Sequence, residues 1–363
     1  METQFKRKLR RTEKALYDLS SLYESAGYEK YKMRKFEEYS LYSENMSFLP
    51  SDRIITFSDI GGKLLALKPD VTLSIAKNYT KAEQTKVYYN ENVYRLSRET
   101  KEYTEITQIG LELMGRVDLY GICEVLSLAE KSLACLDDNY IIEISHMGFV
   151  TGLLEALNLS TDAKSAVISA INKKAPHELD KACAEYDIPT ASAKLIKGIP
   201  SLSGSYSTVL EKASEYAVNA KMTEALRQLS EIYGIVGDGH YTIDFSNVSD
   251  DGYYNGLIFK GYINNVPKVV ISGGRYDKLM EKLGKNAQAV GFAVYLGEIE
   301  KYMKDDIKYD VDILLLYSDS DDISSVYARA EALRADGKSV RVQKEPGKVR
   351  AEKTICMAGD TNE

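Results

Sequence analysis

Side chains able to bind a small polar molecule gather within residues 86–115, which read KVYYNENVYRLSRETKEYTEITQIGLELMG. The pattern predicts two strands joined by a charged loop. Alternation along the second strand puts Gln108, Gly110 and Glu112 on one face and three apolar residues on the other. Arg95 ends the first strand within reach of that polar face, where the glycine leaves room for a ligand close to the backbone. An ordinary surface hairpin is the alternative that this pattern, taken alone, would also fit.

A second group of polar side chains lies at a predicted strand-to-helix corner in residues 61–81. A short strand is predicted at residues 64–67, Pro69 prevents a helix from starting there, and a helix begins at Thr72. Asp70 and Thr72 therefore occupy the kind of loop that often binds ligands. Helix capping is the alternative, because Asp and Thr are also good capping residues.

These segments resemble the signature motifs of class II aminoacyl-tRNA synthetases, in the form found in histidyl-tRNA synthetases. Residues 86–115 are similar to the second motif, with its TQ-x-G-x-E strand, and residues 64–72 to the phrase LALRPExT, with Asp70 in place of the glutamate. Residues 273–284 read GGRYDKLMEKLG, a motif specific to these relatives, and residues 289–300 occupy the place of the third motif. The resemblance covers nearly the whole chain outside a helical insertion.

The resemblance implies a histidine-binding pocket. In such a pocket Asp70, Thr72 and Gln108 would hold the α-amino group, while Glu112 and Tyr254 would hold the imidazole. Tyr253 and Tyr254 head a predicted hairpin, where two aromatic residues normally belong to a core. The complete set of implied histidine-binding residues is Asp70, Thr72, Arg95, Gln108, Glu112, Tyr253 and Tyr254.

At four positions, the residue that binds ATP or the reacting groups in the family is replaced in this sequence. Ser97 stands where the family pattern FRxE has the glutamate that holds adenine, and Ser249 stands where the pattern RGLDYYN has its arginine. In the third motif, Tyr295 replaces a glycine that lies under adenine, and Glu298 replaces an arginine that grips the γ-phosphate. Each lost charge-assisted phosphate contact costs about 1.5–3 kcal/mol. We therefore expect no activation of histidine by ATP and no catalytic residue in this chain.

A retained histidine pocket beside a lost ATP site closely resembles the regulatory subunits of ATP phosphoribosyltransferase, a synthetase-like family. The resemblance implies a homodimer within a hetero-octamer, activation of a short-form catalytic subunit in the first step of histidine biosynthesis, and feedback inhibition by histidine. It implies no cofactor, metal, nucleic acid or membrane partner. Two alternatives stay open, a divergent histidyl-tRNA synthetase and a stand-alone histidine sensor. A short-form catalytic subunit encoded beside this gene would favour the regulatory subunit over the sensor.

Composition agrees with a globular protein of the cytoplasm. The 363 residues are 44% hydrophobic and 28% charged, with a net charge of −7 that supplies no general attraction to nucleic acid. The four cysteines and three histidines lack the spacing of a zinc site or a disulfide framework, which fits a reducing compartment. The sequence contains neither a signal-peptide profile nor an apolar run of about 20 residues.

The expected fold is α+β, a class II synthetase-like antiparallel sheet flanked by helices. We expect a core at residues 1–305 that carries a helical insertion at about 149–238, with its loosest stretch, a candidate linker, at 198–204. Residues 306–363 are predicted to form a small βαβ domain, a remnant of an anticodon-binding-like fold. An intact domain of that kind needs roughly 90 residues, near the lower end of typical domain size. We therefore expect no tRNA-reading module.

Overall fold

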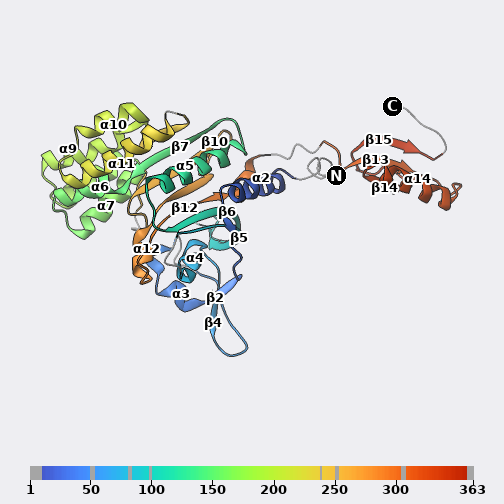
Figure 1. Cartoon of the computed structure of the whole chain (residues 1–363), viewed down its shortest axis with the longest axis horizontal. Helices are drawn as coiled ribbons and strands as arrows, with labels where there is room; N and C mark the ends of the chain where they lie inside the picture. Colours follow the sequence, from blue (N-terminus) through green and yellow to red (C-terminus); the bar gives the residue numbers. More distant parts are fainter. Residues whose placement is uncertain are drawn as a thin grey trace. The chain divides into compact units, whose positions relative to one another are not determined.

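The computed structural model describes residues 10–49, 54–80, 84–97, 100–237, 239–249, 253–303 and 308–357. The chain divides into two compact units (Figure 1). The larger unit is Ala15–Met303, and the smaller combines Met1–Lys14 with Lys304–Glu363.

A nine-stranded sheet forms the centre of the larger unit (Figure 1). Its strands in spatial order are β1 (Glu29–Lys30), β5 (Thr85–Leu96), β6 (Tyr103–Gly115), β12 (Gln288–Tyr295), β11 (Ile271–Arg275), β10 (Leu257–Ile263), β7 (Tyr140–His146), β9 (Tyr241–Asp244) and β8 (Ser203–Ser205). The pairs from β5 to β7 are all antiparallel, whereas β1 with β5 and β7 with β9 are parallel. The expected antiparallel sheet flanked by helices is therefore confirmed.

The predicted alternation along strand β6 is present. Ile109, Leu111 and Leu113 are completely buried in the main hydrophobic core, which helices α2 (Arg11–Ser25) and α5 (Leu119–Ala134) help to build. Gln108 and Glu112 project from the opposite face of the strand and are also buried, each with 2% of its surface exposed. Burial of two polar side chains distinguishes this strand from a surface hairpin, because buried polar groups need partners.

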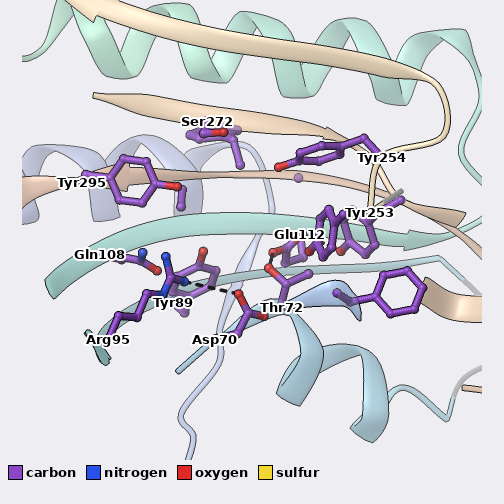
Figure 2. Close-up of a pocket in the computed structure, with 15 residues that line it drawn as sticks. Asp70, Thr72, Tyr89, Arg95, Gln108, Glu112, Tyr253, Tyr254, Ser272 and Tyr295 are labelled. Carbon is purple, nitrogen blue, oxygen red and sulfur yellow. Dashed lines mark hydrogen bonds and ion pairs between the residues drawn. The ribbon is translucent and has the colours of Figure 1, made fainter. Parts of the chain in front are cut away.

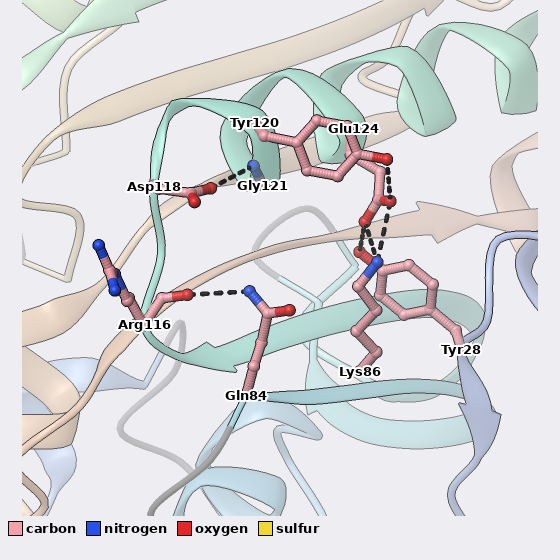
Figure 3. Close-up of polar contacts among 8 residues, drawn as sticks. All are labelled: Tyr28, Gln84, Lys86, Arg116, Asp118, Tyr120, Gly121 and Glu124. Atoms are coloured by element: carbon pink, nitrogen blue, oxygen red, sulfur yellow. Dashed lines mark hydrogen bonds and ion pairs between the residues drawn. The ribbon is translucent and has the colours of Figure 1, made fainter.

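Helix α5 is attached to the edge of the sheet by a polar cluster around Glu124 (Figure 3). The Glu124 carboxylate receives hydrogen bonds from Lys86 Nζ at 2.7 Å, Tyr120 Oη at 3.1 Å and Tyr28 Oη at 3.2 Å. Asp118 caps the helix by accepting from the Gly121 N–H at 3.0 Å. These contacts hold α5 over strands β12, β10 and β7.

The polar face of β6 is covered by a second hydrophobic cluster and a small sheet. Strand β4 (Leu64–Leu67) lies between β2 (Phe36–Glu38) and β3 (Thr56–Ser58), and helix α4 (Thr72–Asn78) follows it. The other elements of this region are α3 (Tyr39–Ser43), η1 (Met46–Phe48) and α12 (Asp277–Lys282), whereas α13 (Leu296–Tyr302) packs Leu296 and Ile299 into the main core. Strand β4 and helix α4 match the predicted corner, which places Asp70 and Thr72 beside the large sheet.

Helices occupy residues between strands β7 and β9. They are α6 (Met147–Ala156), α7 (Thr161–Asn172), α8 (Pro176–Glu185), α9 (Thr190–Gly198), η2 (Ile199–Ser201), α10 (Tyr206–Ser214) and α11 (Ala220–Val236). The predicted linker at residues 198–204 is wrong. Gly198 ends a helix, Ile199 and Leu202 are buried, and β8 pairs antiparallel with β9. The small residues of this stretch serve an edge strand, so their composition does not indicate looseness.

His146 joins the sheet to this helical region. Its Nδ1 accepts the Gly148 N–H at 3.1 Å at the start of α6, and its Nε2 lies 3.0 Å from the Gln228 side-chain oxygen. The first bond assigns the proton of the neutral ring to Nε2. Burial lowers the pKa of His146 to about 4. These contacts give His146 a structural role between the sheet and helix α6.

Acid is expected to destabilise the protein through His146. The pKa is about 4 in the folded chain and about 6.5 in an unfolded one, so the unfolded state takes up the proton first. The contribution to stability is therefore complete above pH 6.5 and is lost, by about 3 kcal/mol, as the pH falls to 4. His146→Asn keeps a helix-capping acceptor without a titrating group. Chemical unfolding between pH 4 and 7 should show a shallower loss of stability for this variant than for the native chain. Equal slopes for His146→Asn and the native chain would contradict this assignment.

The smaller unit contains a three-stranded parallel sheet. Strand β13 (Val311–Leu316) lies between β14 (Val340–Gln343) and β15 (Ala351–Cys356). Helix α14 (Ile323–Ala335) packs Val326 and Ala330 against Ile313 and Leu315 of β13. Strand β15 was not predicted, and it follows β14 after a short loop that has no helix.

No helix in the described part of the chain is long and apolar enough to cross a membrane.

Candidate functional site

A cavity of about 180 Å³ lies over the polar face of strands β6, β12 and β11 (Figure 2). Its volume is close to the ~150 Å³ of a cavity known to hold one benzene ring and below the ~300 Å³ of the smallest drug-sized pockets. The lining residues are Phe48, Asp70, Thr72, Tyr89, Arg95, Gln108, Glu112, Tyr253, Tyr254, Ser272, Tyr276, Gly291, Phe292, Ala293 and Tyr295. All seven residues predicted to bind histidine line this one cavity.

Glu112 is the most strongly perturbed acid of the cavity. Its Oε1 accepts from Thr72 Oγ1 at 2.7 Å and its Oε2 accepts from Tyr276 Oη at 2.6 Å. Burial raises the pKa of Glu112 to about 8, although both hydrogen bonds favour the charged form. Each oxygen keeps a further lone pair, so the carboxyl group can still accept hydrogen bonds from a ligand.

Two glycines shape the floor of the cavity. Gly291 of β12 stands directly opposite Glu112 of β6, and a Cβ at this position would collide with the Glu112 carboxylate. Gly110 was predicted to leave space for a ligand against the backbone. That space is filled instead by the Tyr89 hydroxyl and by the backbone carbonyl of Phe292. Both glycines therefore make room for groups of the protein itself.

Asp70 caps helix α4 and also lines the cavity. Its Oδ1 accepts the Leu73 N–H at 2.8 Å in the first turn of α4, which is a capping bond. Its Oδ2 lies 3.4 Å from Arg95 Nη2 at the cavity wall (Figure 2). Burial raises the pKa of Asp70, and the guanidinium of Arg95 opposes that rise.

Arg95 is the one cationic side chain among the described residues that line the cavity. Its Nε donates to the Pro69 carbonyl at 2.7 Å, which fixes the plane of the guanidinium. The remaining N–H groups leave donors for an anionic group. The cavity thus combines two carboxylates with one guanidinium.

The GGRYD segment positions the tyrosines. Asp277 accepts from Arg275 Nε at 2.8 Å, and the Asp277 N–H donates to the Asn255 side chain at 2.8 Å. These bonds hold the residues just before Asn255, which are Tyr253 and Tyr254. The Tyr254 ring lies against Gly274, where a Cβ would come within 2.6 Å of it.

Tyr276 is a site residue that the sequence reasoning missed. Its hydroxyl binds Glu112, and its ring lies 5.6 Å, centroid to centroid, from that of Tyr253. The signal in the sequence was the position of this tyrosine inside the family-specific GGRYD motif, to which we had assigned no role. Tyr89 and Ser272 were missed as well, and each lies on the face of its strand that Gln108 and Glu112 share across the sheet.

Comparison with known proteins identifies the family to which this chain belongs. The sequence profile of the histidyl-tRNA synthetase family matches residues 3–299. The ATP phosphoribosyltransferase regulatory subunit of Clostridium kluyveri is 31% identical over 335 residues, which are 88% of this chain and 85% of the relative. The chain belongs to the ATP phosphoribosyltransferase regulatory subunit family.

Solved structures agree with the fold of this regulatory subunit family. An ATP phosphoribosyltransferase regulatory subunit/histidyl-tRNA synthetase from Bacillus halodurans C superimposes with a TM-score of 0.82 at 22% identity, covering 95% of this chain and 93% of that one. A chain of the ATP phosphoribosyl transferase complex from Thermotoga maritima gives a TM-score of 0.60 at 21% identity, covering 77% and 96%.

The four positions that depart from active synthetases lie in different places. Tyr295 lines the cavity, next to Arg95 (Figure 2). Ser97 follows the end of β5, and Glu298 lies in α13, where it pairs with Lys301 at 3.2 Å. Ser249 is outside the cavity lining and donates its N–H to the Met147 sulfur at 3.4 Å. The two acids that follow it, residues 250–251, lie outside the described residues.

Proposed function

We propose that this member of the regulatory subunit family binds histidine in the cavity around Glu112. We further propose that it activates a short-form ATP phosphoribosyltransferase catalytic subunit and makes that enzyme sensitive to histidine. The chain itself performs no chemistry, and the partner subunit supplies catalysis.

The observation that carries this proposal is the charge pattern of the cavity. Histidine brings one ammonium, one carboxylate and one imidazole, and the cavity offers Asp70, Arg95 and Glu112 as the opposite groups. In the proposed pose, Asp70, Thr72 and Gln108 hold the ammonium, while Glu112 and Tyr254 hold the imidazole. A single-ring amino acid suits a volume of about 180 Å³.

Absence of adenylate chemistry is the first expected result. The glycine and the arginine of the third motif are replaced by Tyr295 and Glu298, and Tyr295 occupies part of the cavity itself. Incubation with ATP, histidine and labelled pyrophosphate should give no exchange above a protein-free blank. Calorimetry on the same preparation should detect histidine binding, which shows that the protein is folded and competent. Robust histidine-dependent exchange would favour a divergent histidyl-tRNA synthetase.

Membership of the regulatory subunit family supports the proposed partner, a short-form catalytic subunit. One structural neighbour is a chain of an ATP phosphoribosyl transferase complex, and we extend that association to this chain as a homodimer within a cytoplasmic hetero-octamer. Size-exclusion chromatography of this chain with a cognate short-form catalytic subunit should give one earlier-eluting species that contains both. Separate elution at micromolar concentration would favour the stand-alone histidine sensor.

A further inference from the structure

Tyr295 occupies the end of the cavity that lies away from Glu112. It is the last residue of β12 and stands opposite Gln108 of β6 in the sheet register. Figure 2 shows its ring and hydroxyl at the side where Arg95 and Gln108 lie, whereas Tyr253 and Glu112 lie at the other side. The cavity therefore has a phenol and the Arg95 guanidinium, paired with Asp70, at one end and the Glu112 carboxyl group at the other.

The Tyr295 hydroxyl carries a proton that it can donate in a hydrogen bond. Figure 2 shows this hydroxyl on the side of the cavity where Arg95 lies, and both the Arg95 guanidinium and the Ser272 hydroxyl favour the charged form of the tyrosine. Burial nevertheless raises the pKa of Tyr295, which keeps its proton in place at neutral pH. A phenol on the Arg95 side of the cavity can donate this proton to an anion bound to the guanidinium.

We propose that Tyr295 completes, with Arg95, a site for the α-carboxylate of the effector, so that the cavity selects a free amino acid over derivatives blocked at that group. The inference rests on the proposed function and deepens it. The Arg95 guanidinium is fixed by its bond to the Pro69 carbonyl, and Tyr295 lines the cavity on the same side. Arg95 and Tyr295 would then make the carboxylate contact that the family's arginine makes, since Ser249 stands in the place of that arginine here.

The test compares L-histidine with L-histidinol, which keeps the ammonium and the imidazole but lacks the carboxylate. Calorimetry on the native chain should give an affinity about ten- to hundredfold higher for histidine, as expected for charged hydrogen bonds. Tyr295→Phe keeps the ring and removes the donor, so the preference for histidine should fall about tenfold while the affinity for histidinol stays the same. Tyr302→Phe, on the exposed side of α13, is the matched control and should leave both affinities unchanged.

The possible outcomes test the carboxylate site separately from the proposed histidine pocket. If histidine binds through Glu112 and Tyr295→Phe keeps the full preference over histidinol, the carboxylate site is wrong and the histidine pocket stands. If the native chain binds neither compound, the proposed function and this inference both fail. A loss of histidinol affinity equal to that of histidine would show that Tyr295 acts by filling space. Thermal unfolding of Tyr295→Phe, matched to the native chain, confirms that the comparison is between folded proteins.

Discussion

Replacing Glu112 by Gln is expected to weaken histidine binding about ten- to hundredfold. The substitution keeps the size of the side chain but exchanges a carboxyl group for an amide, which weakens its bond to the imidazole by about 1–3 kcal/mol. Calorimetry with L-histidine on the native chain and on Glu112→Gln measures the difference. Glu281→Gln, at an exposed position in α12, is the control and should bind as the native chain does. Unchanged affinity in Glu112→Gln would place the effector site elsewhere.

The same variant is expected to stabilise the ligand-free protein at neutral and alkaline pH. The pKa of Glu112 is about 8 in the folded chain and about 4.3 in an unfolded chain, so the folded state holds the proton across this interval. Stability therefore falls as the pH rises from about 4.3 to 8, where the loss reaches about 4 kcal/mol. Chemical unfolding should show the advantage of Glu112→Gln over the native chain growing by about 3.5 kcal/mol between pH 5 and 8. A constant difference would contradict the raised pKa.

The second large effect concerns the partner subunit. A protein that binds histidine without chemistry can act on another subunit through different affinities for its conformations. Such coupling is reciprocal and amounts to about 1–3 kcal/mol, so histidine affinity should differ about five- to 150-fold between the free chain and the assembly. The catalytic subunit alone should show little activity, gain it on adding this chain, and lose it again when histidine is added. Glu112→Gln should activate as the native chain does while resisting inhibition.

Short-range patterns in the sequence predicted the elements of the site well. The alternation at residues 108–113 identified both faces of β6, and the Pro69 to Thr72 corner identified the boundary between β4 and α4. These features depend on residues within one strand or one turn. The resemblance to synthetases added the distant Tyr253 and Tyr254, which no local pattern could connect to Glu112.

Contacts that depend on the register of the sheet could not be predicted. Tyr276 reaches Glu112 across 164 positions of sequence because β11 and β6 both pair with β12. Tyr89 fills the space above Gly110 because β5 and β6 pair these two residues directly. A glycine next to polar residues looks the same in sequence whether a ligand or a neighbouring side chain approaches it.

The most direct test of the account is an assay of phosphoribosyl-ATP formation by the cognate short-form catalytic subunit. The catalytic subunit is measured alone, with the native chain and with Glu112→Gln, each across a histidine titration. We expect activity in both mixtures, inhibition by histidine in the native mixture, and inhibition shifted to about ten- to hundredfold higher histidine in the variant mixture. A catalytic subunit that gains no activity from the native chain, or a variant mixture inhibited at the same histidine concentration as the native one, would contradict it.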